Sequence, residues 1–292
     1  MDHGLMNSNL ATSLIWLAEI TGVSLAGGVI GSISGLGGGI VIVPVLTLIM
    51  HMPIQEAIGA SIISVIAVSS GAGSVYVRDH ITNVRIAMFL EIATATGAIL
   101  GAAVLAPYIS PRALSILFGL TLLTSLIPIL ANIGEELPKG VHNDKMATAL
   151  RLNGSYYDKR LKREITYQVS GIPASLGVMF SAGIISGLLG IGSGVLKVLA
   201  HEICMKVPTK VSTATSNFMI GVTAAAAAGV YLHKGLVLPF LVVPVATSVL
   251  AGAFWGTKLM EKMTNSGVRK VFAIALGVIG VQMLLKGFGI NV

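Results

Sequence analysis

The residues best able to bind a ligand lie in two glycine clusters set in apolar sequence. The first is Gly35-Leu-Gly-Gly-Gly39, and the second, 155 residues later, is Gly190-Ile-Gly-Ser-Gly194. Glycine lowers helix stability by about 1 kcal/mol relative to alanine, so each cluster predicts a break in an apolar helix. A helix that restarts after such a break has free N–H groups and the positive end of its dipole, which together bind anions. We expect a small-oxyanion site formed by Gly37, Gly38, Gly39, Gly192, Ser193 and Gly194.

Polar side chains near the starts of the next apolar segments extend this predicted site. Ser61 and Ser216 occupy matching positions 155 residues apart, which favours a role in lining the site. Thr215 and Asn217 flank Ser216 and are included with it. The alternative for any one hydroxyl, including that of Ser64, is a hydrogen bond to a carbonyl of its own helix.

Charged residues within apolar segments are a third group of candidates, because ionised groups are costly in lipid. Glu91 could carry a coupled proton or pair with a nearby arginine, and Glu19 is a similar case. Lys197 lies just after the second glycine cluster. It would favour an anionic substrate there, or it could extend its ammonium group to the membrane surface.

The sequence contains no converging set of nucleophile, base and metal ligands. We therefore expect no catalytic residue, no metal site, no cofactor and no enzymatic activity. The single cysteine, Cys204, provides neither a disulfide framework nor a cysteine cluster for a metal. The net charge of +7 is distributed over loops, so nucleic acid is not an expected partner. The expected partners are a small anionic substrate and the lipid bilayer, and the sequence leaves open whether the chain forms a homo-oligomer.

The composition predicts an all-α polytopic membrane protein. Of 292 residues, 54% are hydrophobic and 11% are charged, roughly half the ~25% charge of a soluble domain. Apolar runs near or above the ~18–20 residues that span a bilayer recur along the chain. The expected apolar segments are 10–34, 40–50, 57–77, 86–107, 113–131, 171–189, 195–205, 211–232, 236–255 and 268–285.

The register of 155 residues extends beyond the glycine clusters and predicts an internal duplication. Gly28 matches Gly183, Pro53 matches Pro208 and Tyr76 matches Tyr231. We expect a first membrane repeat at 1–131, a cytoplasmic linker at 132–167 and a second membrane repeat at 168–292. The GxxxG pairs Gly97/Gly101 and Gly252/Gly256 are typical of close helix packing.

The distribution of Lys and Arg decides between two topologies, because cytoplasmic loops carry an excess of both. If each glycine-broken stretch crosses the membrane once, the two halves are parallel. Eleven Lys and Arg residues then lie on one side of the membrane and seven on the other. If each stretch folds as a hairpin, fifteen Lys and Arg residues lie on one side of the membrane and three on the other. We therefore expect two inverted repeats, each a glycine-broken hairpin plus three transmembrane helices, with both termini outside. The chain would be a multi-pass protein of the cytoplasmic membrane, with the linker inside.

The segment Gly-Leu-Gly-Gly-Gly-Ile-Val-Ile-Val-Pro-Val-Leu, beginning at Gly35, is partly repeated by Gly-Leu-Leu-Gly-Ile-Gly-Ser-Gly-Val-Leu, beginning at Gly187. Together with the Pro53/Ala57/Ser61 and Pro208/Ser212/Ser216 pattern, it resembles the sulfite exporter TauE/SafE family. The resemblance implies secondary transport of sulfite or small organosulfonates across the cytoplasmic membrane, often outward. The second copy departs from the pattern, since Ser193 interrupts the glycine triplet and Leu199 stands in the place of Pro44.

The sequence and this resemblance together predict a secondary transporter that exports a small sulfur-containing anion. Its transport cycle would move one repeat or bundle against the other around a site at the membrane midplane. Two alternatives stay open. One is an anion channel that uses the same site, and the other is a membrane scaffold without transport activity. A scaffold would tolerate replacement of the glycines by alanine.

Overall fold

The computed structural model describes residues 3–34, 37–130, 144–158, 162–260 and 265–290. The fold is all-α apart from two short strands, as the composition predicts. In the first half the elements are α1 (His3–Ser34), α2 (Gly39–Pro44), the π-helical turn η1 (Val45–Ile49), α3 (Ile54–Arg78), α4 (Val84–Ile99), the π-helical η2 (Leu100–Leu105), the 3-10 turn η3 (Ala106–Tyr108) and α5 (Pro111–Leu130). The linker contains α6 (Lys145–Ala149), β1 (Gly154–Asp158) and β2 (Arg163–Tyr167). The second half contains α7 (Ile172–Leu189), α8 (Gly194–Leu199), the π-helical η4 (Ala200–Cys204), α9 (Thr209–His233), α10 (Pro239–Met260) and α11 (Asn265–Gly287).

Six helical stretches of the described chain are long and apolar enough to cross a membrane. They are Ile15–Ile33, Ile54–Arg78, Val84–Tyr108, Ile172–Leu189, Thr209–His233 and Pro239–Leu259. Three apolar helices are shorter, at Gly39–Ile49, Pro111–Ile127 and Leu276–Gly287. The observed segments agree with the expected ones to within a few residues at most ends, because proline and charged residues delimit them.

The chain reverses direction at each glycine cluster. A Cβ atom on Gly27, in α1, would lie 3.5 Å from Cγ1 of Ile42, so α2 runs back along the end of α1. In the second half the start of α7 lies beside the end of η4. The Ser170 amide donates a hydrogen bond of 3.2 Å to the Met205 carbonyl there. Each glycine-broken stretch is therefore a helical hairpin.

The two halves repeat the same local structure at the same register. The π-helical turns η1 and η4 lie 155 residues apart, although Pro44 precedes the first and Leu199 the second. His51 and Lys206, also 155 residues apart, follow them with φ angles of 53° and 57°. The missing proline therefore does not change how the second hairpin ends.

The helix pairs follow the relation between the two halves: the partner of a helix in one half corresponds to the partner of its counterpart in the other half. Helix α1 packs along α10 and α4 along α7, while α3 packs along α9 and α5 along α11. The GxxxG glycines lie in the first two contacts. A Cβ on Gly97 or Gly101 would overlap a backbone carbonyl of α7, and one on Gly252 would overlap the Leu25 carbonyl of α1. The prediction that these glycines permit close packing is confirmed.

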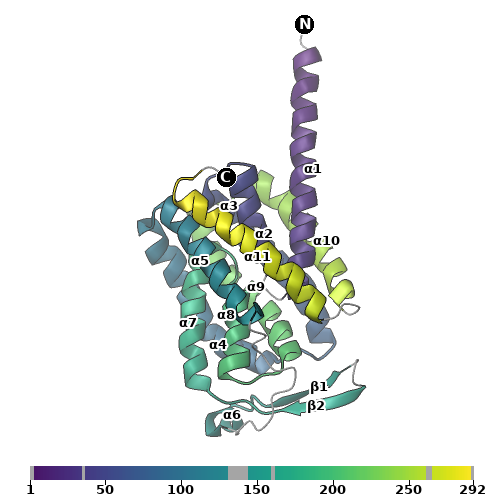
Figure 1. Cartoon of the computed structure of the whole chain (residues 1–292), viewed down its shortest axis with the longest axis vertical. Helices are drawn as coiled ribbons and strands as arrows, with labels where there is room; N and C mark the ends of the chain where they lie inside the picture. Colours follow the sequence, from purple (N-terminus) through teal and green to yellow (C-terminus); the bar gives the residue numbers. More distant parts are fainter. Residues whose placement is uncertain (1–2, 35–36, 131–143, 159–161, 261–264, 291–292) are drawn as a thin grey trace.

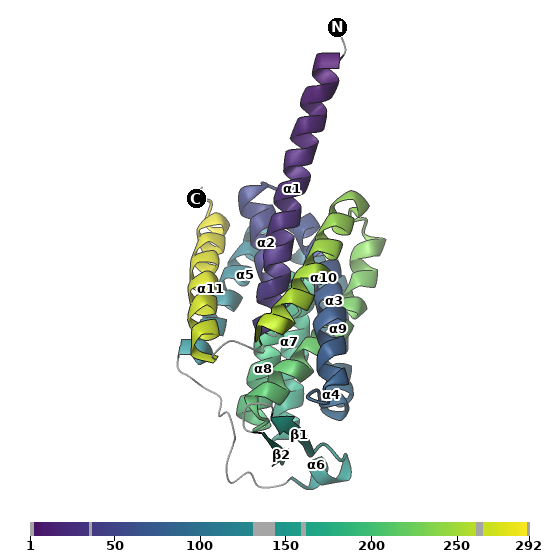
Figure 2. The same ribbon diagram turned by 90° about the vertical axis from the view of Figure 1, so that its right-hand side faces the viewer.

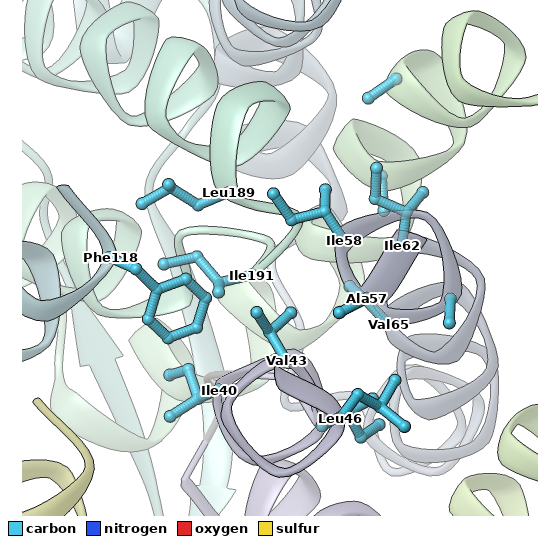
Figure 3. Close-up of a cluster of buried hydrophobic side chains, with 14 of the residues drawn as sticks. Ile40, Val43, Leu46, Ala57, Ile58, Ile62, Val65, Phe118, Leu189 and Ile191 are labelled. Atoms are coloured by element: carbon cyan, nitrogen blue, oxygen red, sulfur yellow. The ribbon is translucent and has the colours of Figure 1, made fainter. Parts of the chain in front are cut away.

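Both termini lie at one end of the molecule, and the linker strands with α6 lie at the other (Figures 1 and 2). Helix α1 starts at the end that holds the termini, whereas α7 starts at the end that holds the linker (Figure 1). Buried side chains of the first hairpin, of α3 and of α5 meet between these ends. Ile40 and Val43 lie near Phe118 and Ile191 there (Figure 3).

The linker is more structured than its polar composition suggested. Strands β1 and β2 form an antiparallel pair, with Tyr156 opposite Ile165. Both of these side chains are buried in a cluster with residues of α4, α7 and α9. The Asn83 side chain, at the start of α4, donates hydrogen bonds of 2.9 Å to the Leu152 carbonyl and 2.8 Å to the Tyr167 hydroxyl. Burial raises the pKa of the Tyr167 phenol, which stabilises its neutral form.

Candidate functional site

The two helix breaks lie against each other in the interior of the protein. A Cβ on Gly39 would lie 2.7 Å from the carbonyl oxygen of Gly190. Gly37 and Gly192, at matching positions, have φ angles of 78° and 72°. Such angles are easily reached only by glycine. The sequence therefore needs glycine at these breaks both for backbone conformation and for the close approach of the two hairpins.

Two aliphatic side chains separate the breaks and are themselves related by the register of 155. A Cβ on Gly37 would lie 3.2 Å from Ile220 and 3.4 Å from Val65, and one on Gly192 would lie 3.1 Å from each of the same two residues. The described glycines of both clusters are buried. Irregular backbone at membrane depth requires such enclosure, because lipid offers it no hydrogen bonds. Gly35 and Leu36 lie outside the described residues.

The paired serines both reach the glycine breaks. The Ser61 hydroxyl donates a hydrogen bond of 2.7 Å to the Gly190 carbonyl and so joins α3 to the break in the other half. The Ser216 hydroxyl donates one of 3.2 Å to the Gly194 carbonyl. Ser64 instead donates to the Ser61 carbonyl of its own helix, the alternative expected for a membrane serine. The match between the two halves therefore distinguishes Ser61 and Ser216 from a serine such as Ser64, which bonds only within its own helix.

Two polar atoms close to the second break have no hydrogen-bond partner among the described residues. They are Oγ of Ser193 and Oδ1 of Asn217, and both residues are buried. Ser193 has a φ angle of 48°. Asn217 uses its amide nitrogen to donate a hydrogen bond of 3.3 Å to the Thr213 carbonyl. An unpaired buried polar group costs about 1–3 kcal/mol, so both atoms favour a partner. The Ser193 hydroxyl can donate to an anion, whereas Oδ1 of Asn217 can only accept from a donor.

Thr215 has its contact elsewhere. Its hydroxyl accepts a hydrogen bond of 3.1 Å from the Asn83 amide, at the start of α4. The structure thus joins Thr215 to the loop before α4, and no contact between its side chain and either glycine break is among the hydrogen bonds described.

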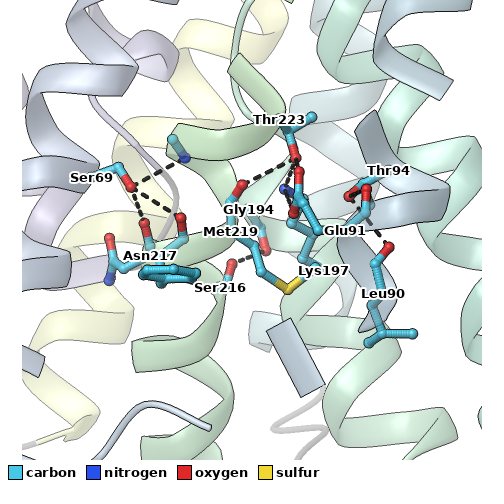
Figure 4. A network of polar contacts seen from close by, with 12 residues as sticks. Ser69, Leu90, Glu91, Thr94, Gly194, Lys197, Ser216, Asn217, Met219 and Thr223 are labelled. Carbon is cyan, nitrogen blue, oxygen red and sulfur yellow. Dashed lines mark hydrogen bonds and ion pairs between the residues drawn. The ribbon is translucent and has the colours of Figure 1, made fainter. Parts of the chain in front are cut away.

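The buried charges form a chain of contacts across three helices (Figure 4). The Lys197 ammonium group donates a hydrogen bond of 2.5 Å to the Thr223 hydroxyl, and this hydroxyl lies 2.5 Å from Oε1 of Glu91. Oε2 of Glu91 lies 3.9 Å from the same ammonium group. Lys197 is 0% exposed and Glu91 is 6% exposed. We call this set the charged triad: Glu91 on α4, Lys197 on α8 and Thr223 on α9.

This geometry rules out one alternative for each of the two buried charges. Lys197 does not extend to a membrane surface, because its ammonium group is fully buried. Glu91 pairs with Lys197 rather than with an arginine. Glu19 is exposed on α1, apart from this group of charges. Sequence reasoning missed Thr223, since a lone threonine in an alanine-rich helix gives no signal until its neighbours in space are known.

No group of three or more His, Cys, Asp or Glu residues that could hold a metal ion occurs in the described part of the chain. The candidate site therefore comprises backbone amides and carbonyls at the breaks, the hydroxyls of Ser61, Ser193 and Ser216 and the Asn217 amide, with the charged triad nearby. Such a set can bind a small anion through hydrogen bonds and one cation.

The sequence model of the sulfite exporter TauE/SafE family matches residues 20–283. The chain belongs to this family. Its relatives include the probable membrane transporter protein YunE of Bacillus subtilis, which is 25% identical over 91% of this chain and 96% of its own length. The probable membrane transporter protein YdhB of the same organism is 27% identical, over 88% of this chain and 96% of its own length. The probable membrane transporter protein MJ0441 of Methanocaldococcus jannaschii is 24% identical, over 88% of this chain and 91% of its own length. No solved structure matches the chain.

Membership of the TauE/SafE family and the apolar helices make this chain a multi-pass membrane transporter. The sequence-based resemblance to the family is confirmed. The matched range contains both glycine breaks and all three residues of the charged triad.

Proposed function

We propose that this TauE/SafE protein is a secondary transporter that exports a small sulfur-containing anion, sulfite or an organosulfonate, across the cytoplasmic membrane. The observation that carries the proposal is the meeting of two glycine-broken hairpins, with Gly39 against the carbonyl of Gly190. Paired broken helices in the two halves of a transporter mark its binding site. The sulfur chemistry of the substrate comes from the family description.

The anion binds in this proposal to the backbone amides that follow each break. Helix α2 continues into η1 and α8 into η4, so each restarted helix has its first N–H groups at the glycines. The binding residues are Gly37, Gly38, Gly39, Gly192, Ser193 and Gly194, with Ser61, Ser216 and Asn217 beside them. The unpaired hydroxyl of Ser193, which can donate a hydrogen bond to an anion, supports this assignment. Thr215 would act indirectly, by holding the loop before α4 through its hydrogen bond with the Asn83 backbone amide.

We expect alternating access, in which one half of the molecule moves against the other around the site. The exchange of helix pairs between halves and the opposite starting ends of α1 and α7 support the inverted-repeat arrangement. Burial of both breaks corresponds to a state closed to both sides of the membrane. An inside-negative membrane potential favours export of an anion that crosses without a proton, by about 2.3 kcal/mol per charge per 100 mV.

The test is a flux assay with the purified protein in liposomes, using sulfite, sulfate, taurine and an arylsulfonate. We expect saturable efflux of sulfite or a sulfonate that exceeds that of sulfate. Flux too fast for a conformational cycle would identify a channel instead. The absence of flux for every anion offered would contradict the proposal and favour a scaffold role.

A further inference from the structure

The charged triad joins Glu91 of the first half to Lys197 and Thr223 of the second, and it is not repeated at the positions related to it by the register of 155. Counting back or forward by 155 residues, Lys197 corresponds to Ile42, Thr223 to Val68 and Glu91 to Ala246. Ile42 and Val68 are 1% and 0% exposed, so apolar side chains fill the equivalent space. The fold therefore does not need charges at these positions. Buried ion pairs are often no more stabilising than apolar residues of the same volume, which argues for a functional reason.

The triad lies next to the second glycine break. Lys197 is in the first turn of α8, where its amide donates a hydrogen bond of 3.1 Å to the Ser193 carbonyl. Side chains of a helix lean toward its N-terminus, which here is the break itself. Lys197 follows Gly194 by three residues, less than one helical turn, and its ammonium group lies 3.9 Å from Oε2 of Glu91 (Figure 4). The ammonium group of Lys197 is therefore close to the proposed anion site but already has an anion, the Glu91 carboxylate.

The two oxygens of the Glu91 carboxylate differ in their hydrogen bonding. Oε1 accepts a hydrogen bond from Thr223, whereas Oε2 accepts none within the described residues and lies 3.9 Å from the Lys197 ammonium group. Oε2 can therefore receive a proton without losing a hydrogen bond. Protonation leaves the positive charge of Lys197 uncompensated in a buried site, and a transported anion can compensate it.

We propose that Glu91 is a built-in counter-anion that competes with the transported anion for Lys197, so that the anion binds when Glu91 takes up a proton on Oε2. The inference rests on the proposed anion transport. Glu91 and Lys197 are neutral together, and Lys197 with one proton on Glu91 and one monoanion is neutral as well. An anion beside an ionised Glu91 would leave one net negative charge buried, which is costly. One proton and one anion are thus transported together in the same direction.

Other ionisable groups near Glu91 are few. Helix α7, which packs along α4, has none in its sequence, and the ionisable residues of α9 lie toward its two ends, at Lys210, Tyr231 and His233. Helix α4 itself carries only Arg85 besides Glu91. After α8, the turn η4 adds His201 and Glu202. His201 is fully buried, and neither of its ring nitrogens has a hydrogen-bond partner in the described chain, so it is the competing candidate for the proton.

The experiment uses liposomes containing the full-length protein and an alkylsulfonate, whose charge does not change between acidic and neutral pH. Anion uptake and the accompanying proton flux are measured for the wild type, Glu91→Gln and His201→Gln. We expect wild-type anion affinity to rise as pH falls. In Glu91→Gln the affinity at neutral pH should be about 5–150-fold higher and independent of pH, since coupling energies of about 1–3 kcal/mol are typical. Its proton flux should be lost, while exchange of internal for external anion persists.

The control is a variant that gives each residue of the charged triad the residue found 155 positions away: Glu91→Ala, Thr223→Val and Lys197→Ile together. It should fold with unchanged thermal stability and transport no anion. Proton coupling that survives in Glu91→Gln, or that is lost in His201→Gln instead, would overturn the inference, as would normal transport by the triple variant. If the wild type transports no anion at all, the proposed function fails first. Normal anion transport without any pH dependence would overturn only the role of Glu91.

Discussion

Ser193 is the residue at which the two glycine breaks differ most. Its counterpart Gly38 has a φ angle of −64°, within reach of any residue, whereas Ser193 has a φ angle of 48°. A left-handed conformation costs a non-glycine residue roughly 1–2 kcal/mol. The hydroxyl of Ser193 also lacks a hydrogen-bond partner among the described residues. Two costs at one residue, where glycine would avoid both, suggest that the hydroxyl contacts the substrate.

Ser193→Gly should therefore separate stability from transport. Removing the side chain relieves the backbone strain, so the melting temperature in detergent should rise by about 2–4 °C. Loss of one hydrogen bond to the anion, worth about 0.5–1.5 kcal/mol, should weaken its binding roughly 2- to 12-fold. Thermal unfolding and the concentration dependence of flux measure the two effects. Unchanged anion affinity in a stabilised variant would show that Ser193 does not contact the substrate.

At the residue level, the duplication supplied a second observation that directed attention to residues at the glycine breaks. Ser61 and Ser216 stood out because they match across the two halves, and both hydroxyls reach a glycine break. Lys197 and Glu91 stood out because charges are rare in apolar helices. Their mutual contact could not be inferred, because it depends on how α4, α8 and α9 pack, and Thr223 joins them without any sequence signal.

At the scale of secondary-structure elements, each glycine break reverses the direction of the chain and forms a helical hairpin. Gly192 combines a left-handed backbone with neighbours at 3.1 Å on two sides, whereas a Cβ on Gly177, in the middle of α7, would meet nothing within 4 Å. The two glycines are therefore a matched pair for substitution.

Gly192→Ala should destabilise the protein by about 1–2 kcal/mol and strongly reduce flux, because the new methyl group strains the backbone and presses on Val65 and Ile220. Gly177→Ala should leave flux unchanged and stabilise the protein by up to about 1 kcal/mol. Thermal unfolding and liposome flux test both variants. Equal behaviour of the two would mean that the conformation at Gly192 is not required.

The linker is the element that sequence reasoning described least well. Its strands contain alternating aromatic and β-branched residues such as Tyr156 and Ile165, a weak strand signal next to a strongly basic turn. Its docking depends on contacts with distant residues, which no local pattern reveals. Asp158, for example, forms a 2.8 Å ion pair with Lys210 of α9.

Asn83→Ala should loosen the linker. The Asn83 side chain caps α4 through the Ile86 amide and also holds the Leu152 carbonyl and the Tyr167 hydroxyl. Its loss should cost about 0.5–2 kcal/mol and speed proteolytic cleavage within the linker. Asp144→Ala is the control, because Asp144 caps only the short helix α6 through the Met146 amide. Cleavage rates that rise equally in both variants would argue against docking through Asn83.

At the scale of the whole molecule, the sequence predicted the helices, the hairpins and the register of the duplication. These features follow from composition, glycine and proline, which act locally and can be compared between halves. The pairing of α1 with α10 and of α4 with α7 could not be derived, since it depends on close packing at small residues spread over four helices. The GxxxG spacing indicated the contact surfaces but not the partners.

Cysteine labelling tests the arrangement of the whole chain in the membrane. In a Cys204→Ser background, single cysteines at Lys145 and Lys206 should react with a membrane-impermeant reagent from the same side. A cysteine at Arg112 should react from the opposite side. All three native residues are exposed. Labelling of positions 145 and 206 from opposite sides would support parallel halves and contradict the inverted arrangement.

The central claim is that the backbone at the two breaks holds the transported anion, and Gly38→Val tests it most directly. A Cβ on Gly38 would have its nearest neighbour at 3.3 Å, and the φ angle of −64° suits a side chain, so the fold should survive. Sulfite flux into liposomes is compared with that of Gly177→Val, which makes the same change in open space. The account predicts at least a tenfold loss of flux, equivalent to about 1.4 kcal/mol, in Gly38→Val alone. Equal flux in the two variants would contradict it.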